Sequence, residues 1–591
     1  MPFPQKGLRR RWTELKTSSI LIDFLKRNWY KYLLGFLALV MVDLLQVYVP
    51  RIVGKIVDSL NTETMNFAEL KIMIGWIMAA ASGMFLGRFL WRYFLGGASR
   101  YFLLETMNRM FSKMLSLTPG FFDRMRSGEL MARFTNDLSL LRRVLGQGAI
   151  LLFDSFIMVL MVFIFMIGNV GWKLAWISFA PLLLLVPTSM SFGRLIHRRV
   201  ADVQRSFSEL SGFTEETING IRIVKSFSSE DVSFGIFEEK ANVNFRDTLR
   251  AVKVSSVFRP LITLIASSSF FLALLYGGRA VINEKITLGD FIAFNSYLGM
   301  LIWPMMAYGF MVDLFQRGRA AMRRMDTIFT AQPEVKEPER PVKIDHFKSV
   351  IIRDLTYRYP GTDRPVLKNI NMKVKRGEMI GIVGSVGSGK TTIAKLLMKL
   401  YPVERGKIFI NGVDINDISS EDLRRIFTLV PQETFLFSDT IRNNITVGMK
   451  NVDEKEIERV TKLAAVYEDI MSFPEKFDTV VGERGVTLSG GQRQRITIAR
   501  ALIRDFEVYI FDDCLSAVDP ETEEKIISSI RNSMKGKTII VITHRLKVLK
   551  DADRIYVLDD GFIKEEGRHE ELLSRDGIYS RMYRKQLIEG G

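Results

Sequence analysis

Cysteine is nearly absent from this sequence, since Cys514 is the only one among 591 residues. A single thiol cannot form an intrachain disulfide, and it excludes every metal site built from a cluster of cysteines. The sequence also contains no helix-turn-helix, zinc-finger or polymerase pattern. These absences exclude disulfide-stabilised folds, zinc modules and the familiar nucleic-acid enzymes.

What the sequence does contain is a series of long apolar runs in its first half. A run of about 20 residues can cross the hydrocarbon core of a membrane. We expect six membrane-spanning helices, at about 30–56, 71–95, 149–170, 171–192, 260–282 and 288–314. Only the segment 169–173 separates the third span from the fourth, and its glycine predicts a tight helical hairpin.

Positive charge is distributed unevenly around these runs. Lys and Arg precede the first run and crowd the stretches 98–143 and 194–259, whereas the short loop 59–66 has few. Because basic loops stay on the cytoplasmic side, we expect a multi-pass protein of the cytoplasmic (inner) membrane with a cytoplasmic N-terminus and a cytoplasmic second half. Residues 1–29, which are apolar and basic without a small-residue cleavage site, predict an interfacial helix rather than a removed signal peptide.

The net charge is strongly positive, +17 from 82 Lys and Arg against 65 Asp and Glu. Such a charge can indicate a nucleic-acid partner. Six membrane spans flanked by basic loops explain it better, because basic residues also face anionic lipid headgroups. We therefore expect membrane lipid, and no nucleic acid, as a partner.

A glycine-rich loop lies in the second half, between an apolar strand at 378–383 and a helix that begins at Thr391. Such a loop points backbone N–H groups and a helix N-terminus at phosphate oxygens, while Lys390 reaches the outer phosphates and Thr391 ligates Mg²⁺. The pattern predicts a nucleotide site with Mg²⁺, although on its own it fits many nucleotidases. Its residues are Gly384, Ser385, Val386, Gly387, Ser388, Gly389, Lys390, Thr391 and Thr392.

A second fragment, at 488–492, is more specific, and it contains Ser489, Gly490, Gly491 and Gln492. With it, the sequence from about 345 to the end resembles the nucleotide-binding domain of ATP-binding cassette (ABC) proteins. In that family two such domains hold two ATP molecules, each between the phosphate loop of one domain and the Ser-Gly-Gly-Gln of the other. The resemblance implies an α/β P-loop fold, with ATP and Mg²⁺ as cofactors.

The resemblance also implies roles for residues elsewhere in this domain. Tyr359 matches the ring that stacks on adenine, Gln432 the residue that reaches Mg²⁺ and the attacking water, and His544 the γ-phosphate sensor. The run 508–512 is apolar and ends in a carboxylate, which predicts a buried parallel strand that delivers Asp512 to the metal. The metal ligands expected for Mg²⁺ are therefore Thr391, Gln432 and Asp512.

Asp519, in the run 516–519, matches the segment that touches the opposite domain in this family. Two cytoplasmic stretches also resemble the coupling segments of type IV (exporter-type) members. The first covers 121–137, including Phe121 and Asp123, and the second covers 219–225. A short exposed helix with Phe or Ile can seat in a groove of the ATP domain, so that closure of that domain moves two long helices.

One residue departs from the family pattern. Asp513 follows Asp512 at the position where hydrolytically competent members carry Glu. This acid orients or deprotonates the attacking water and must come within about 2.6–3.2 Å of it. Because Asp is one methylene shorter, and a displacement of about 1 Å can cost about a hundredfold in rate, we expect slow or no hydrolysis at this chain's own loop. The alternative is a harmless conservative replacement.

The signature at 488–492 is intact, whereas the acid Asp513 is one methylene short. This combination predicts a transporter built from two unlike subunits. The chain resembles one subunit of the heterodimeric bacterial multidrug exporters, in which a partner half-transporter carries the catalytic Glu. The expected organisation is an interfacial helix at 1–29, a six-helix transmembrane domain at 30–325, a linker at 326–345 and the nucleotide-binding domain at 346–591.

The expected substrates are hydrophobic or amphipathic small molecules, exported with energy from ATP. Asp43 lies in the middle of the first span, where a carboxylate is a candidate contact for a cationic amphipath. Its alternative role is pairing with Gln46 or with another helix. Two other functions fit the same architecture: a lipid or lipopeptide flippase, and, more distantly, an ATP-gated channel or regulatory subunit.

Overall fold

The computed structural model describes residues 16–62, 65–449, 451–482 and 488–589. The chain forms two compact units. The first consists of Met1–Ser116 with Ser127–Ala331, and the second of Leu117–Arg126 with Gln332–Gly591. The short segment 117–126, which lies within the basic stretch 98–143, therefore belongs to the second unit.

All regular secondary structure among the described residues of the first unit is helical, and its helical stretches are long. Six of them are apolar enough to cross a membrane: Thr17–Asn61, Phe67–Leu115, Ser127–Val170, Trp172–Asn219, Glu230–Ile282 and Leu288–Phe329. They confirm the six predicted spans. Most continue well past the apolar runs into the basic stretches, so each span and its polar extension form one rod.

Several of these rods contain short turns of wider helix, which divide them into named elements. Four such turns are η1 Arg92–Gly96, η2 Arg133–Asp137, η3 Val144–Gly148 and η4 Ala273–Gly277. The α-helices are α1 Thr17–Asn61, α2 Phe67–Trp91, α3 Gly97–Leu115, α5 Ser127–Ala132, α6 Leu138–Arg143, α7 Ala149–Val170, α8 Trp172–Leu183, α9 Leu185–Asn219, α10 Ile221–Ser226, α11 Glu230–Leu272, α12 Gly278–Ile282 and α13 Leu288–Phe329.

Gly171 alone separates α7 from α8, and its φ of +77° belongs to the left-handed region that favours glycine. The predicted hairpin between the third and fourth spans is thus confirmed. Helix α2 is apolar on all sides, yet within the unit it buries only Ala80 and Gly87. A helix of this kind is expected to face lipid.

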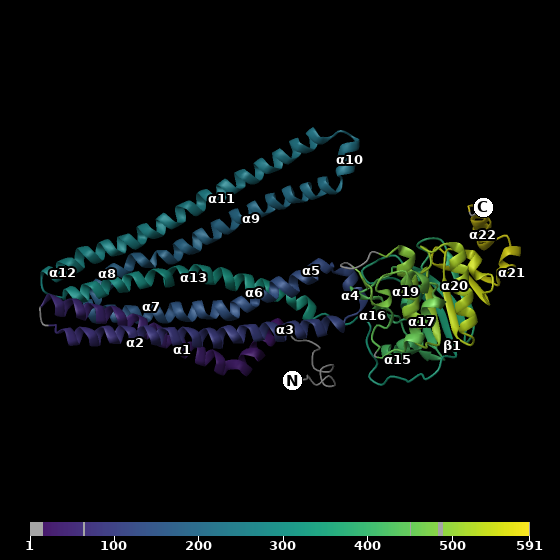
Figure 1. Cartoon of the computed structure of the whole chain (residues 1–591), viewed down its shortest axis with the longest axis horizontal. Coiled ribbons are helices and arrows are strands. Elements are labelled where there is room, and N and C mark those ends of the chain that lie inside the picture. Colours follow the sequence, from purple (N-terminus) through teal and green to yellow (C-terminus); the bar gives the residue numbers. More distant parts are fainter. Residues whose placement is uncertain (1–15, 63–64, 450, 483–487, 590–591) are drawn as a thin grey trace. The chain divides into compact units, whose positions relative to one another are not determined.

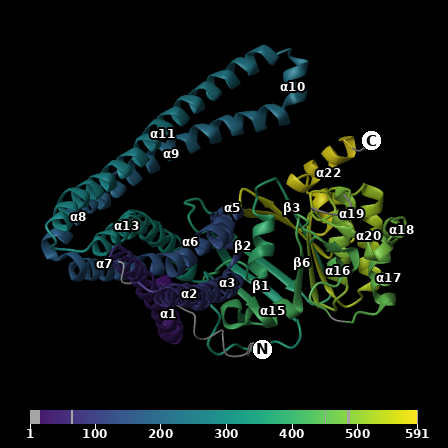
Figure 2. The ribbon, with the colours of Figure 1, turned by 60° about the vertical axis from the view of Figure 1, so that its left-hand side comes forward.

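Two subsets of helices are visible in the first unit. Helices α9 and α11 run side by side as a long hairpin, with α10 at its tip (Figure 1, Figure 2). Helix α1 packs against α2, α7 and α13. Helix α1 bends at Asn28, where φ is −113° and ψ is 17°. The expected interfacial helix at 1–29 lies partly outside the described residues, and its described part is the first segment of α1.

The second unit is a mixed α/β domain. Its strands are β1 Ser349–Tyr357, β2 Leu367–Lys375, β3 Met379–Gly384, β4 Ile408–Ile410, β5 Val413–Asp414, β6 Phe427–Val430, β7 Asp439–Thr440, β8 Val480–Val481, β9 Val508–Asp512, β10 Thr538–Ile542, β11 Arg554–Asp559 and β12 Phe562–Gly567. Its helices are α4 Pro119–Arg124, α14 Lys390–Leu397, α15 Ser420–Ile426, α16 Ile441–Ile445, α17 Glu454–Leu463, α18 Tyr467–Met471, α19 Gly490–Leu502, α20 Pro520–Ser533, α21 His569–Ser574 and α22 Ile578–Glu589.

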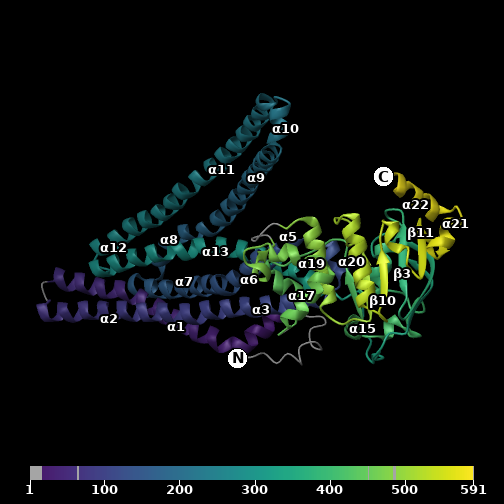
Figure 3. The same cartoon turned by 45° about the vertical axis from the view of Figure 1, so that its right-hand side comes forward.

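The central sheet has the order β12-β11-β3-β10-β9-β6. Strands β11, β3, β10, β9 and β6 are parallel, and β3, β9 and β10 are buried along their whole length. The neighbouring strands β10, β3 and β11 can be followed in Figure 3. These apolar runs confirm the strands predicted at 378–383 and 508–512. Ile542 pairs with both Ile382 and Asp512, so the C-terminal ends of three strands share one edge. Ligands of open parallel sheets bind at this edge.

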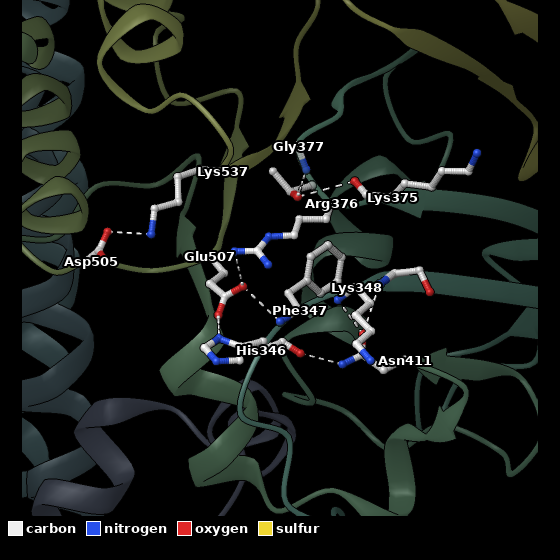
Figure 4. A network of polar contacts seen from close by, with 12 residues as sticks. His346, Phe347, Lys348, Lys375, Arg376, Gly377, Asn411, Asp505, Glu507 and Lys537 are labelled. Atoms are coloured by element: carbon white, nitrogen blue, oxygen red, sulfur yellow. Dashed lines mark hydrogen bonds and ion pairs between the residues drawn. The ribbon is translucent and has the colours of Figure 1, made fainter.

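The chain enters the second unit through an irregular stretch between Phe329 and Ser349. Glu507, just before β9, fixes the end of this stretch, because its carboxylate accepts from the Phe347 amide at 3.0 Å and meets His346 Nδ1 at 3.1 Å (Figure 4). Arg376 lies 3.8 Å from the same carboxylate. Burial raises the pKa of Glu507, but the Phe347 amide, His346 and Arg376 outweigh it and hold that pKa below its usual range.

Candidate nucleotide site

The glycine-rich loop between β3 and α14 is shaped by backbone that other residues cannot adopt. Gly384 has a φ of +154°, and a Cβ there would lie 2.0 Å from the carbonyl oxygen of Leu558. Gly389, with a φ of +100°, would place a Cβ 2.5 Å from Leu367. Both positions require glycine for close approach of the backbone as well as for the left-handed φ. The loop lies at the C-terminal edge of the sheet, as predicted.

Two polar side chains of the loop are set up for an anion. Lys390 Nζ donates to the carbonyl oxygens of Gly384 at 3.0 Å and Ser385 at 2.8 Å. Burial lowers the pKa of Lys390, while Asp513 and Asp512 oppose that shift. Ser388 is 2% exposed, and its hydroxyl has no hydrogen-bond partner among the described residues. A phosphate group fits such a loop, because it would satisfy both groups.

Thr391 and Asp512 meet at the same edge. The Thr391 hydroxyl donates to Asp512 Oδ1 at 3.0 Å, across 121 residues of sequence. Burial raises the pKa of Asp512, the Thr391 hydroxyl lowers it, and Asp513 raises it. Mg²⁺ is usually bound through one or two protein oxygens together with phosphates. This donor pair fits that pattern, and the described residues contain no group of three or more His, Cys, Asp or Glu that could hold a metal by itself.

Gln432, Asp513 and His544 join this group from three different loops. Gln432 Nε2 donates to Asp513 Oδ2 at 3.3 Å. Burial lowers the pKa of His544, the charge of Lys390 lowers it further, and Asp513 opposes both. His544 is therefore neutral near pH 7 and can donate one hydrogen bond to a phosphate oxygen.

Tyr359 follows β1 and lies beside the start of α14. Its hydroxyl shares a hydrogen bond of 3.1 Å with Thr392 Oγ1. Val386, at the tip of the loop, is 89% exposed, and Gly387 has a φ of +80°. The structure thus places every predicted residue of the phosphate loop, with Tyr359, around one site.

The signature residues form a second, separate group. Ser489 caps α19: its hydroxyl accepts from the Gln492 amide at 3.2 Å, and the Gln492 side chain accepts from the Ser489 amide at 3.0 Å. Asp519 caps α20 by accepting from the Thr522 amide at 2.9 Å. Three of the four signature residues and Asp519 line one surface recess, whose lining residues are Ser489, Gly490, Gly491, Arg495, Ala517, Val518 and Asp519.

The residues that hold the segment 516–519 at this recess were not predicted from the sequence. Gln494 bonds to the Ser516 hydroxyl at 3.2 Å and to the Ala517 amide at 3.0 Å. Arg545 donates to the carbonyl oxygen of Val518 at 2.7 Å and pairs with buried Glu523. Since Arg545 directly follows His544, it connects the two groups. The position of Arg545 next to His544 in the sequence is the signal that could have identified it.

Comparison with known proteins identifies the two units. A family model described as "ABC transporter transmembrane region" matches residues 32–305, and one described as "ABC transporter" matches 367–516. The multidrug resistance-like ATP-binding protein MdlA of Escherichia coli is 36% identical over 567 residues, which is 96% of each chain. The probable multidrug resistance ABC transporter ATP-binding/permease protein YheI of Bacillus subtilis is 33% identical over 96% of this chain and 98% of its own length.

Two further similarities extend the comparison. The ATP-dependent lipid A-core flippase of Syntrophus aciditrophicus is 33% identical, over 90% of this chain and 87% of its own. A solved structure of a bacterial Atm1-family ABC exporter with ATP bound superposes with a TM-score of 0.78 at 26% identity, and covers 95% of this chain and 99% of that one. The chain therefore belongs to the ABC transporter family, as a multi-pass exporter in which the transmembrane region and the ATP-binding domain that drives transport are one polypeptide.

Proposed function

We propose that this chain is one half of a heterodimeric exporter that moves hydrophobic or amphipathic small molecules outward across the cytoplasmic membrane. It contributes a slow ATP site at its own phosphate loop, and its signature residues complete the active site of a partner that carries the catalytic Glu. The names of the MdlA and YheI relatives support multidrug substrates. The N-terminus and the second unit lie on the cytoplasmic side.

The observation that carries this proposal is the fixed backbone at Asp513. Its φ is +44°, and its amide donates to the carbonyl oxygen of Ile542 at 2.8 Å. Its neighbours in sequence, Asp512 and Cys514, are each 2% exposed. The backbone at Asp513 therefore cannot shift toward the attacking water to make up for the missing methylene. A carboxylate held about 1 Å short of the attacking water costs about a hundredfold in rate.

In the proposed mechanism the phosphate-loop amides and Lys390 bind the phosphates, and Thr391 and Asp512 hold Mg²⁺ with the help of Gln432. Mg²⁺, when bound, neutralises phosphate charge. Tyr359 stacks on the adenine, and neutral His544 donates to the γ-phosphate. Composite sites exist only when two ATP-binding domains close on each other, so ATP stabilises the closed pair through its differential affinity for that state.

Movement reaches the membrane through the coupling segments, which we assign to α4 and α10. Helix α10 buries none of its residues within the first unit, and Ile221 and Ile223 are 46% and 66% exposed. Phe227, just past the helix, is 77% exposed. A cluster of exposed apolar side chains at a helical tip supports docking on an ATP-binding domain of the partner.

A cationic amphipath is the substrate that the first unit favours. Asp43 is 3% exposed, it interacts electrostatically with Asp154 of α7, and its Oδ2 has no hydrogen-bond partner among the described residues. Acidic groups inside an apolar bundle are expensive and usually functional. The similarity to a lipid A-core flippase supports the second candidate, a lipid flippase.

The test uses the assembly of this chain with its partner in inside-out vesicles. ATP-dependent uptake of a labelled cationic amphipath is expected, and ATPase activity should be lost when the partner's catalytic Glu is replaced by Gln. ATPase activity that survives this replacement would contradict the unequal pair. Stimulation by lipid, with no uptake of the amphipath, would favour the flippase.

A further inference from the structure

Three tyrosines form a continuous aromatic group in the second unit, between the phosphate loop and α4. Tyr357 ends β1, Tyr359 follows it, and Tyr401 comes after α14. The ring of Tyr359 meets Tyr357 edge-on at 5.3 Å and Tyr401 edge-on at 5.0 Å between centroids. Tyr359 is therefore packed between the other two rings, and a shift of its ring must displace the ring of Tyr401.

The two ends of this group make hydrogen bonds to different functional parts. At one end, the Tyr359 hydroxyl bonds to Thr392 beside the phosphate loop. At the other end, the Tyr401 hydroxyl donates to Asp123 of α4, which is 278 residues away in sequence. Tyr401 is 4% exposed, and burial and the Asp123 carboxylate raise the pKa of its hydroxyl. The hydroxyl therefore stays protonated and remains a donor at neutral pH.

Helix α4 is also held on its other side. Arg124 pairs with Glu334, in the irregular stretch that precedes β1. A Cβ at Gly120 would lie 2.4 Å from Glu334 Oε2, so glycine allows the backbone of α4 to approach this carboxylate. Helix α4 is thus held by both Glu334 and Tyr401, and of these two Tyr401 is the one whose ring packs against Tyr359.

We propose that Tyr401 is a positioning residue that links occupancy of the nucleotide site to the placement of α4, through its hydrogen bond to Asp123. The inference rests on the proposed function, since it takes Tyr359 as the adenine contact. An adenine ring stacked on Tyr359 restrains that ring, hence the packing of Tyr401 and the direction of its hydroxyl. By linkage, a correctly placed α4 favours nucleotide binding to the same extent.

The replacement Tyr401→Phe tests this inference, because it keeps the ring and removes the hydroxyl. Hydrogen exchange of the segment 117–126 is measured on the assembled transporter with and without ATP, together with stimulation of ATPase activity by a cationic amphipath. In the parent protein, ATP should slow exchange in this segment. In the variant, the ATP-dependent protection and the stimulation should both fall about tenfold, which is the usual effect of losing a hydrogen bond to a charged acceptor.

Matched variants separate this role from simple packing. Tyr357→Phe deletes the same atom from a buried hydroxyl that has no hydrogen-bond partner among the described residues, so it should behave as the parent. Asp123→Asn keeps an acceptor oxygen and should retain coupling, whereas Asp123→Leu should resemble Tyr401→Phe. Asp123 is exposed, so both changes avoid the core.

Two results would overturn the inference. One is parent-like ATP-dependent protection and stimulation in both Tyr401→Phe and Asp123→Leu. The other is an equal loss in Tyr357→Phe, which would show that the aromatic group matters only for packing. Binding of a fluorescent ATP analogue to the parent tests the proposed function separately. An assembly that binds no nucleotide contradicts that function, whereas one that binds it without protecting 117–126 contradicts only the role of Tyr401.

Discussion

The phosphate-loop group and the signature group differ in how completely each matches the family pattern. The phosphate-loop group carries its lysine, metal ligands and histidine, but its acid is Asp513 in place of Glu. The signature group, from Ser489 to Gln492, matches the family pattern throughout. Since each ATP in this family lies between one group from each domain, our proposal gives a single chain a part in one slow site and one fast site. Changes in the two groups should therefore act on different ATP molecules.

The largest effect is expected in the signature group. In Gly491→Ala the new Cβ would lie 3.0 Å from the carbonyl oxygen of Ala517, and it would narrow the recess that covers the partner's ATP. Displacing one donor from a charge-stabilising site typically costs about a hundredfold or more in rate. Total ATPase activity of the assembly should fall by about that factor, with thermal unfolding unchanged. A fall of less than about threefold would mean that the fast site does not use this recess.

The second-largest effect concerns Asp513, whose side chain is one methylene shorter than that of Glu. Asp513→Glu restores the longer acid, and hydrolysis at this chain's own site should rise about a hundredfold. The measurement is ATPase activity in an assembly whose partner carries Gln at its catalytic position, so that only this site can turn over. Asp513→Asn in the same background serves as the control and should stay inactive. No gain from Glu would show that something other than side-chain length limits the site.

A smaller effect is expected from removing the loop lysine. Lys390→Ala deletes a cation that meets the outer phosphates in our assignment, and affinity for ATP at this site should fall about tenfold to a hundredfold. Hydrolysis at the other site should continue, so ATPase activity should fall far less than in Gly491→Ala. Nucleotide titration with a fluorescent analogue gives the affinity. If both variants abolish turnover equally, the division into a slow and a fast site is wrong.

The smallest effect is expected for a change at Glu507, which belongs to neither group. Its folded-state pKa is held below 4.5, so its contribution to stability is present above pH 4.5 and is lost as pH falls through the folded-state pKa. Glu507→Gln should lower the unfolding free energy of the second unit by about 1 kcal/mol at pH 7 and by less at acidic pH. Denaturant unfolding at several pH values measures this difference. Nucleotide affinity should not change, in contrast to Lys390→Ala.

Periodicity and composition were sufficient to predict the elements that carry the site. The six spans follow from apolar runs, and β3 and β9 follow from short apolar runs that end at Gly384 and Asp512. The extent of the rods was harder to predict. Their polar ends are stabilised by packing between helices, and α9 has the polar, amphipathic sequence of a rod outside the hydrocarbon.

Contacts between distant segments could not be predicted. Tyr401 and Asp123 are 278 residues apart, and nothing local marks them as partners. The same holds for Gln494, which reads as one more polar residue of a helix until the fold brings Ser516 to it. The left-handed backbone of Asp513 likewise depends on its amide reaching the end of the neighbouring strand.

The solitary thiol has a practical consequence. Cys514 is 2% exposed, and burial raises the pKa of its thiol, so thiolate, the form that reacts with maleimides and other labels, is scarce. Introduced cysteines on α4 or α10 would thus take a spin or fluorescent probe in an otherwise natural sequence. Movements of these two helices could be followed without first removing the native residue beside Asp513.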